Sequence, residues 1–173
     1  MTSKLKTDIL ETVSGSGTIA LTNQLSGMTH ASMPSGSVLQ VVHVKGSATD
    51  TTTTSTSYVA SGLQASITPM YSNSKILVTF NSVSHANPAS ANQGVKVSIF
   101  RGGAEPSPTM RGGLRKQTGN WISASYSIVG LDSPNTTSSV TYEAYFKTIS
   151  TTGYFLVDHV DSKPTLTLTE IKG

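Results

Sequence analysis

The chain has 173 residues, of which 36% are hydrophobic, 12% are charged and none is cysteine. Without cysteine it has neither a disulfide framework nor thiol chemistry, and a net charge of +3 is too small to mark a nucleic-acid-binding protein. Ser and Thr account for 52 residues, 27 Ser and 25 Thr. Because Ser and Thr compete for helix hydrogen bonds and Thr packs well on strands, this composition predicts an all-β protein.

Residues 1–36 are predicted to be an N-terminal arm that cannot bury its own apolar side chains. Leu5, Ile9 and Val13 lie four residues apart, which fits one face of a helix but also one face of a strand. The Ser-Gly repeat at 14–17 ends either element. We expect an extended, strand-like arm or stalk whose apolar residues contact other chains. The predicted contacts are Leu5, Ile9, Leu10, Val13, Ile19 and Leu21.

Residues 37–173 are predicted to be a C-terminal β-sandwich of about eight strands, a size that suits a jelly roll. Each strand is an alternating or continuous apolar run bounded by turn residues. The predicted strands are 38–45, 58–59 with 63–68, 75–85, 95–101, 121–129, 140–147, 154–157 and 165–171. The segments 46–57 and 102–120 are predicted to be loops, the second because of its glycines and prolines.

Alternation within the strands predicts which side chains share a face. One such set is expected on the core side of each of two strands, and a third set shares one side of the last strand. These sets are Ile76, Val78 and Phe80; Val95, Val97 and Ile99; and Leu166, Leu168 and Glu170. The last strand runs almost to the C-terminus, so we expect the end of the chain to lie within a sheet.

The sequence gives weak signals for catalysis. Glycoside cleavage needs two carboxylates that converge across a sugar, and the nearest approach to a pair is Asp158 and Asp161 beside His159, which we interpret as a polar turn. The four histidines have no metal-ligand spacing, although three copies of His30 could meet on a threefold axis. We expect a protein that is not an enzyme and needs no cofactor or metal.

Basic residues concentrate between positions 101 and 116. One hypothesis is a patch for acidic lipopolysaccharide, in which charge attracts the glycan and a nearby tryptophan ring stacks on a sugar. The alternative, which we favour, is a solvated loop with the tryptophan in the core. The candidate receptor contacts are Arg111, Arg115, Lys116 and Trp121, with Arg101 also in the cluster.

Six segments of the chain form a recognisable series: Lys4-Leu-Lys-Thr-Asp-Ile9, Gly15 to Asn23, Pro34 to Val42, Leu63 to Pro69, Ser74-Lys-Ile-Leu-Val78 and Leu166 to Gly173. Together they resemble small tail-fibre and related virion proteins of tailed bacteriophages of aquatic or cyanophage type. The resemblance covers most of the chain, but not the segment 102–120. It implies a homotrimeric fibre with an N-terminal attachment region and a β-sandwich head similar to the tumour-necrosis-factor and C1q heads.

The resemblance also implies a location and partners. The protein would be made in the host cytoplasm and built into the virion, held by another phage structural protein of the tail, baseplate, neck or capsid. Its trimeric head would adhere to the host surface, where a glycan is a possible receptor. The first 13 residues lack the apolar core of a secretory signal and no apolar run spans a bilayer, so we expect no membrane insertion. The basic stretch is short and matches no nucleic-acid-binding motif, so we expect no nucleic-acid binding.

Two other functions are kept as alternatives. The chain could be a capsid cement, head-decoration or neck-fibre protein, which sequence alone does not separate from a tail fibre. A small glycan-cleaving enzyme is a weaker alternative. Removal of residues 1–35 would distinguish the enzyme from the two structural functions. A fibre or cement protein would lose its place on the particle, whereas an enzyme head could stay active.

Overall fold

The computed structural model describes residues 29–46, 51–86, 94–115, 122–149, 153–155 and 163–173. The chain divides into two compact units, Met1–Met33 and Pro34–Gly173. In the first unit the described part is a single 3₁₀ turn, His30–Ser32, closed by a hydrogen bond from the Ser32 amide to the Thr29 carbonyl. The arm contacts predicted between Leu5 and Leu21 lie outside the described residues, so they stay predictions.

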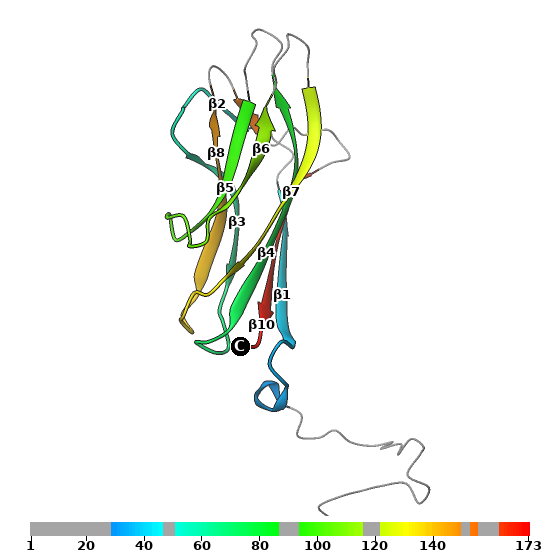
Figure 1. The fold of residues 1–173 in the computed structure, drawn as a ribbon, viewed down its shortest axis with the longest axis vertical. Coiled ribbons are helices and arrows are strands. Elements are labelled where there is room, and N and C mark those ends of the chain that lie inside the picture. The colour runs from blue at the N-terminus through cyan, green and yellow to red at the C-terminus, as the bar shows by residue number, and fades with distance from the viewer. Residues whose placement is uncertain (1–28, 47–50, 87–93, 116–121, 150–152, 156–162) are drawn as a thin grey trace, which may run out of the picture. The chain divides into compact units, whose positions relative to one another are not determined.

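The second unit is a β-sandwich of two antiparallel sheets, which confirms the all-β prediction (Figure 1). The described strands are β1 (Val38–Lys45), β2 (Thr51–Thr53), β3 (Val59–Ile67), β4 (Lys75–Ala86), β5 (Gly94–Arg101), β6 (Met110–Arg115), β7 (Ile122–Asp132), β8 (Val140–Thr148), β9 (Gly153–Phe155) and β10 (Thr165–Ile171). Sheet A joins them in the order β1-β10-β4-β9-β2, with β7 on β4, and sheet B in the order β3-β8-β5-β6.

The eight longer strands pair in a nested pattern. The first pairs with the last (β1 with β10), the second with the seventh (β3 with β8), the third with the sixth (β4 with β7) and the fourth with the fifth (β5 with β6). The outermost and third pairs join into sheet A through β10 and β4, and the other two pairs join into sheet B through β8 and β5. Because β10 lies between β1 and β4, the C-terminal end of the chain is built into a sheet, as the sequence predicts.

The core lies between the two sheets and contains the inward sets that alternation predicts. Val78 and Phe80 of β4, Val97 and Ile99 of β5, and Leu168 of β10 are all buried. Burial of such side chains contributes roughly 1.5–3 kcal/mol each, which is why the period-two pattern fixes the strand register. Glu170 is also fully buried, on the same side of β10 as the leucines.

Two buried carboxylates tie the sandwich together. Asp132 at the end of β7 accepts hydrogen bonds from Arg101 Nη1 at 2.6 Å and from the Tyr142 hydroxyl at 2.7 Å. Glu170 accepts hydrogen bonds from Gln40 Nε2 at 2.6 Å and from the Met70 amide at 2.7 Å. Both acids therefore have partners, as buried charges require.

Two segments differ from the sequence prediction. Residues 51–53, within a predicted loop, form β2 against β9. The segment 102–120, predicted to be a loop throughout, contains β6. Glycines led to that error, since Gly112 and Gly113 are turn signals in isolation. In the fold, Gly112 faces the core, and an added Cβ would lie 2.8 Å from Ile128 Cγ1. Ile128 therefore leaves no room for a side chain at this position of β6.

The outer face of sheet A is nearly free of charge. Strand register places three rows of side chains on it: Val41, Thr169, Leu77 and Leu131; His43, Thr167, Thr79 and Val129; Lys45, Thr165, Asn81 and Ser127. Val129 is 63% exposed and Val41 57% exposed, unusually high values for valines in a strand. Val38 and Ile171 extend this apolar surface at one end, where the exposed Lys75 lies opposite Ile171. We call these residues the apolar face of sheet A.

Candidate functional site

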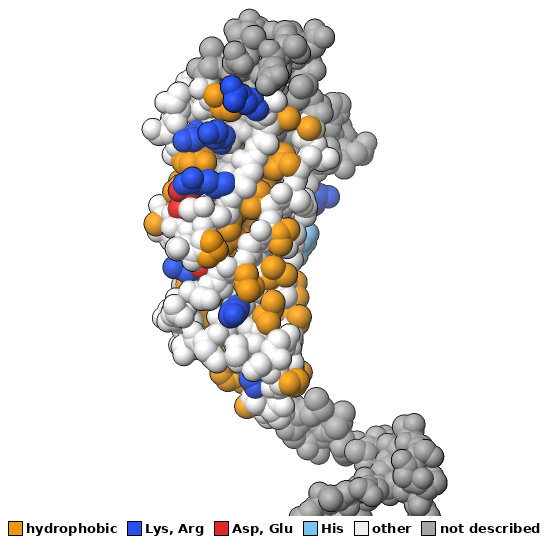
Figure 2. Space-filling view, in the orientation of Figure 1, with side chains coloured by type: hydrophobic (Ala, Val, Ile, Leu, Met, Phe, Trp, Pro, Cys, Tyr) orange, Lys and Arg blue, Asp and Glu red, His pale blue; other side chains and the backbone are white. Residues whose placement is uncertain are grey.

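The outer face of sheet B has a different character, because cationic and aromatic side chains occupy many of its outward positions. Alternation along β5, β6 and β8 places Lys96, Arg111, Arg115, Tyr145 and Lys147 outward while their neighbours enter the core. In Figure 2 the Lys and Arg side chains gather in a column over β5 and β6, whereas hydrophobic side chains follow β7. The two outer faces of one sandwich therefore suit different partners.

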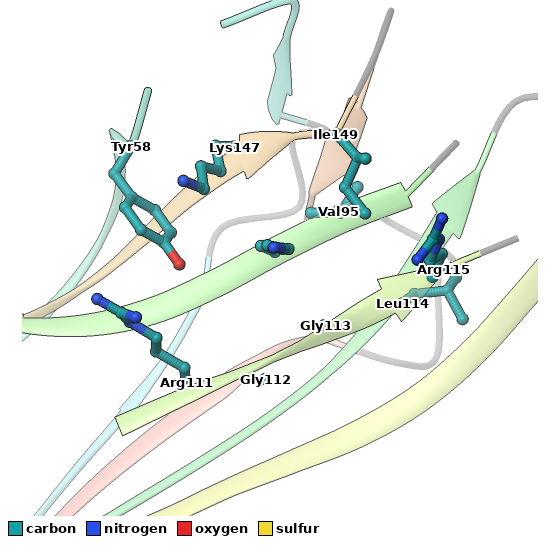
Figure 3. A pocket seen from close by; sticks show the side chains of 10 residues that line it. Tyr58, Val95, Arg111, Gly112, Gly113, Leu114, Arg115, Lys147 and Ile149 are labelled. Atoms are coloured by element: carbon teal, nitrogen blue, oxygen red, sulfur yellow. The ribbon is translucent and has the colours of Figure 1, made fainter. Parts of the chain in front are cut away.

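A hollow of about 410 Å³ lies on this basic side. Its lining residues come from the segment before β3 and from β5, β6 and β8 with the residue after it: Tyr58, Val95, Lys96, Arg111, Gly112, Gly113, Leu114, Arg115, Lys147 and Ile149. Figure 3 shows Tyr58 and Lys147 on one side of the hollow and Arg111 across from them, with Arg115 at the other end. The volume falls within the range of small-molecule sites.

Four cations surround the hollow and one acid offsets them. Lys96 lies directly opposite Lys147 in the β5–β8 pairing and opposite Gly113 in the β5–β6 pairing. Glu105 binds Arg111, so the group of Lys96, Arg111, Arg115, Lys147 and Glu105 carries four positive charges and one negative, a net charge of +3. Like charges directly opposite on a sheet destabilise it, which makes this arrangement costly in the absence of an anion.

Glu105 orients the Arg111 guanidinium group. Arg111 Nε donates to Glu105 Oε1 at 2.7 Å, Nη2 donates to Oε2, and the Ser98 hydroxyl donates to Oε1 at 2.5 Å. The Arg111 hydrogen bonds, followed by the Ser98 bond and the nearby positive charges, outweigh partial burial and lower the pKa of Glu105 to about 2. The same pair raises the pKa of Arg111, so both groups stay charged at any physiological pH.

Aromatic rings continue from the hollow across sheet B. Phe100 stacks on Tyr145 with ring centroids 4.1 Å apart and meets Tyr58 edge-on at 5.6 Å. Lys147 Nζ lies 4.5 Å from the centre of the Tyr58 ring, a cation–π contact that fixes both side chains. Burial of the Tyr58 hydroxyl raises its pKa, partly offset by Arg111, toward which the hydroxyl points in Figure 3.

One position of this outer face requires glycine. Gly113 has φ +155°, and an added Cβ would collide with the Val95 carbonyl oxygen. The exposed position between Arg111 and Arg115, opposite Lys96, therefore carries no side chain. A ligand can approach the backbone at that point, which is a recurrent use of glycine within strands.

The structure brings two predicted receptor contacts together and separates a third residue from them. Arg111 and Arg115 both line the hollow, although from strand β6 rather than from a loop. Arg101 belongs instead to the Asp132 pair. Lys116 and Trp121 lie outside the described residues. Sequence reasoning missed Lys96 and Lys147, whose only signal was their outward position in alternating strands, and Tyr58, which comes directly before β3.

Other chemistry considered from the sequence has little support in the described part of the chain. His43 lies exposed on sheet A, and its Nδ1 is hydrogen-bonded to Thr167 Oγ1 at 2.8 Å. Within the described ranges no cluster of His, Asp or Glu could hold a metal ion, and no helix is long and apolar enough to cross a membrane. Asp158, His159 and Asp161 lie outside the described residues.

Comparison with known proteins gives this chain no family. The sequence matches no family model and no curated protein.

Proposed function

We propose that this chain is a structural virion protein of a tailed bacteriophage, the homotrimeric head and attachment arm of a fibre that adheres to the host surface. The sequence resemblance supports the phage assignment. The nested pairing of eight strands in two sheets supports a jelly-roll head, since it is the pairing that a long antiparallel hairpin adopts when it rolls into two layers.

The main support for a trimer is the apolar face of sheet A. Exposed valines and Leu131 there are surrounded by threonines, with Lys45 at one end of the face and Lys75 at the other. Interfaces of permanent homo-oligomers are more apolar than ordinary surface and depleted in charge at their centre. The proposed occupants are two further copies of this chain around a threefold axis.

The chain before β1 favours sister copies over a foreign partner. Its six apolar residues between Leu5 and Leu21 need burial that a segment of this length cannot supply to itself. The chain then enters β1, whose exposed Val38 and Val41 belong to the apolar face. A threefold assembly supplies partners to both segments at once. Three heads then give adhesion its strength through avidity rather than through one tight contact.

Two measurements test this proposal. The mass of the full chain in solution should be three times its 18.1 kDa, and a monomer at micromolar concentration would exclude the trimer. Imaging of labelled particles should place the protein at the tail or neck in few copies. A label spread over the whole capsid lattice would instead establish the cement alternative.

A further inference from the structure

We infer that the hollow on sheet B is a binding site for an acidic glycan, a sugar chain that carries carboxylate or phosphate groups. We call it the glycan hollow, with Tyr58, Lys96, Arg111, Arg115 and Lys147 as its contacts. This inference deepens the proposed adhesion function by naming the ligand class and the strands that bind it.

Charge selects an anion. The group around the hollow has a net charge of +3. Lys96 and Lys147 are cross-strand neighbours of like charge, at a position where a pair of unlike charges would stabilise the sheet. Glu105 partly offsets the positive charge of Arg111 and also holds its guanidinium group in one orientation through two hydrogen bonds. Glu105 takes the Nε–Nη2 edge of the group, so a ligand carboxylate or phosphate would bind at its Nη1–Nη2 edge.

Shape and apolar lining favour a sugar over a nucleic acid. The hollow encloses only about 410 Å³, and its lining includes the Tyr58 ring and the partly exposed Ile149 beside the cations. Sugar rings offer C–H faces to such groups, while their charged substituents reach the Lys and Arg side chains. Single-stranded nucleic acid needs a long basic groove with successive stacking rings. Among the described residues, the outward cations of sheet B gather around one hollow, and the rings Phe100 and Tyr145 stack on each other.

The glycine at position 113 adds a route to the backbone. With no side chain between Arg111 and Arg115, a ring can lie against β6 and reach both guanidinium groups. A side chain at this position would collide with the backbone of β5.

Titration calorimetry on the full chain tests the site. The probes are a galacturonic acid tetrasaccharide, a galactose 6-phosphate oligosaccharide, the uncharged galactose tetrasaccharide and a 12-residue oligothymidine. We expect one or both acidic sugars to bind, the uncharged sugar to bind at least tenfold more weakly, and affinity to fall as salt is raised from 50 to 300 mM. Which acidic sugar binds more tightly identifies the substituent as carboxylate or phosphate.

The variant Lys96→Gln/Arg115→Gln removes two of the four cations and should weaken acidic-sugar binding at least tenfold. Its matched control, Lys45→Gln/Lys75→Gln, removes the same charge from exposed positions of sheet A and should bind like the unaltered chain. Equal binding of charged and uncharged sugars, tighter binding of oligothymidine, or equal loss in both variants would overturn the site. These outcomes are independent of the proposed fibre, since a trimer on the particle tail could fail to bind and a chain absent from particles could still bind.

Discussion

Lys96 on β5 and Lys147 on β8 face each other directly on the outer surface of sheet B. Two like charges at such a position lower the stability of a sheet. Tyr58 relieves part of this cost, because its ring accepts the Lys147 ammonium group at 4.5 Å. The pair therefore destabilises the sheet slightly, and its positive charge is better explained by ligand binding than by stability.

Reversing one of these charges should therefore stabilise the protein while abolishing its ligand binding. Lys96→Glu creates an opposite-charge pair with Lys147, and we expect the free energy of unfolding to rise by about 0.5 kcal/mol. Acidic-glycan affinity should fall at least tenfold. Urea denaturation and calorimetry measure the two effects. The control Lys45→Glu, which faces Thr165 on sheet A, should change neither by a comparable amount; loss of stability in Lys96→Glu would contradict the prediction.

The apolar face of sheet A leads to a prediction about assembly. Val129→Lys places a charge within the proposed trimer contact, on β7, where Val129 is 63% exposed in the single chain. Burial of an unpaired charge in an interface is strongly unfavourable, so we expect a shift from trimer to monomer at micromolar concentration. Sedimentation equilibrium measures the change. Gln64→Lys, at an exposed position of β3, should remain trimeric.

The Asp132 cluster is expected to stabilise the monomer fold. Asp132→Ala leaves the fully buried Tyr142 hydroxyl without its acceptor and Arg101 without its carboxylate, and we expect a loss of about 2–3 kcal/mol in the free energy of unfolding. Tyr142→Phe removes one hydrogen bond and leaves the Arg101 pair, so it should cost less, about 1 kcal/mol. Chemical denaturation of both variants checks this order. Equal stability of Asp132→Ala and the unaltered protein would show that the cluster contributes nothing.

The sequence predicted the core strands well because burial imposes a two-residue period. Ile76, Val78 and Phe80 were assigned to one face, and the structure buries all three. The same period failed at β6, where Gly112 and Gly113 replace the apolar and polar side chains that would have shown it. Only the packed fold explains these glycines, one facing Ile128 and the other the Val95 carbonyl group.

The site was harder to predict than the fold. Lys147 and Lys96 are 51 positions apart in the chain and meet only through the β5–β8 pairing. In its own strand, each lysine occupies an outward position of the kind that is ordinarily exposed to solvent. Arg111 and Arg115 were noticed because they lie close in sequence, whereas Arg101, equally close, turns toward Asp132. Strand pairing rather than sequence distance decides which cations share a surface.

The Glu105–Arg111 pair predicts a specific pH dependence of stability. The folded pKa of Glu105 is about 2, below its ordinary value of 4.5, so its contribution is fully present above about pH 4.5 and is lost as the pH falls toward 2. Glu105→Gln removes that contribution. We expect the variant to be less stable by under about 1 kcal/mol at pH 7, since the pair is partly solvated, and the difference to shrink between pH 4.5 and 2. Urea denaturation at pH 7, 4.5, 3 and 2 measures it. A difference that stays constant down to pH 2 would mean that the effect of the substitution comes from packing or from the Ser98 contact rather than from the charge.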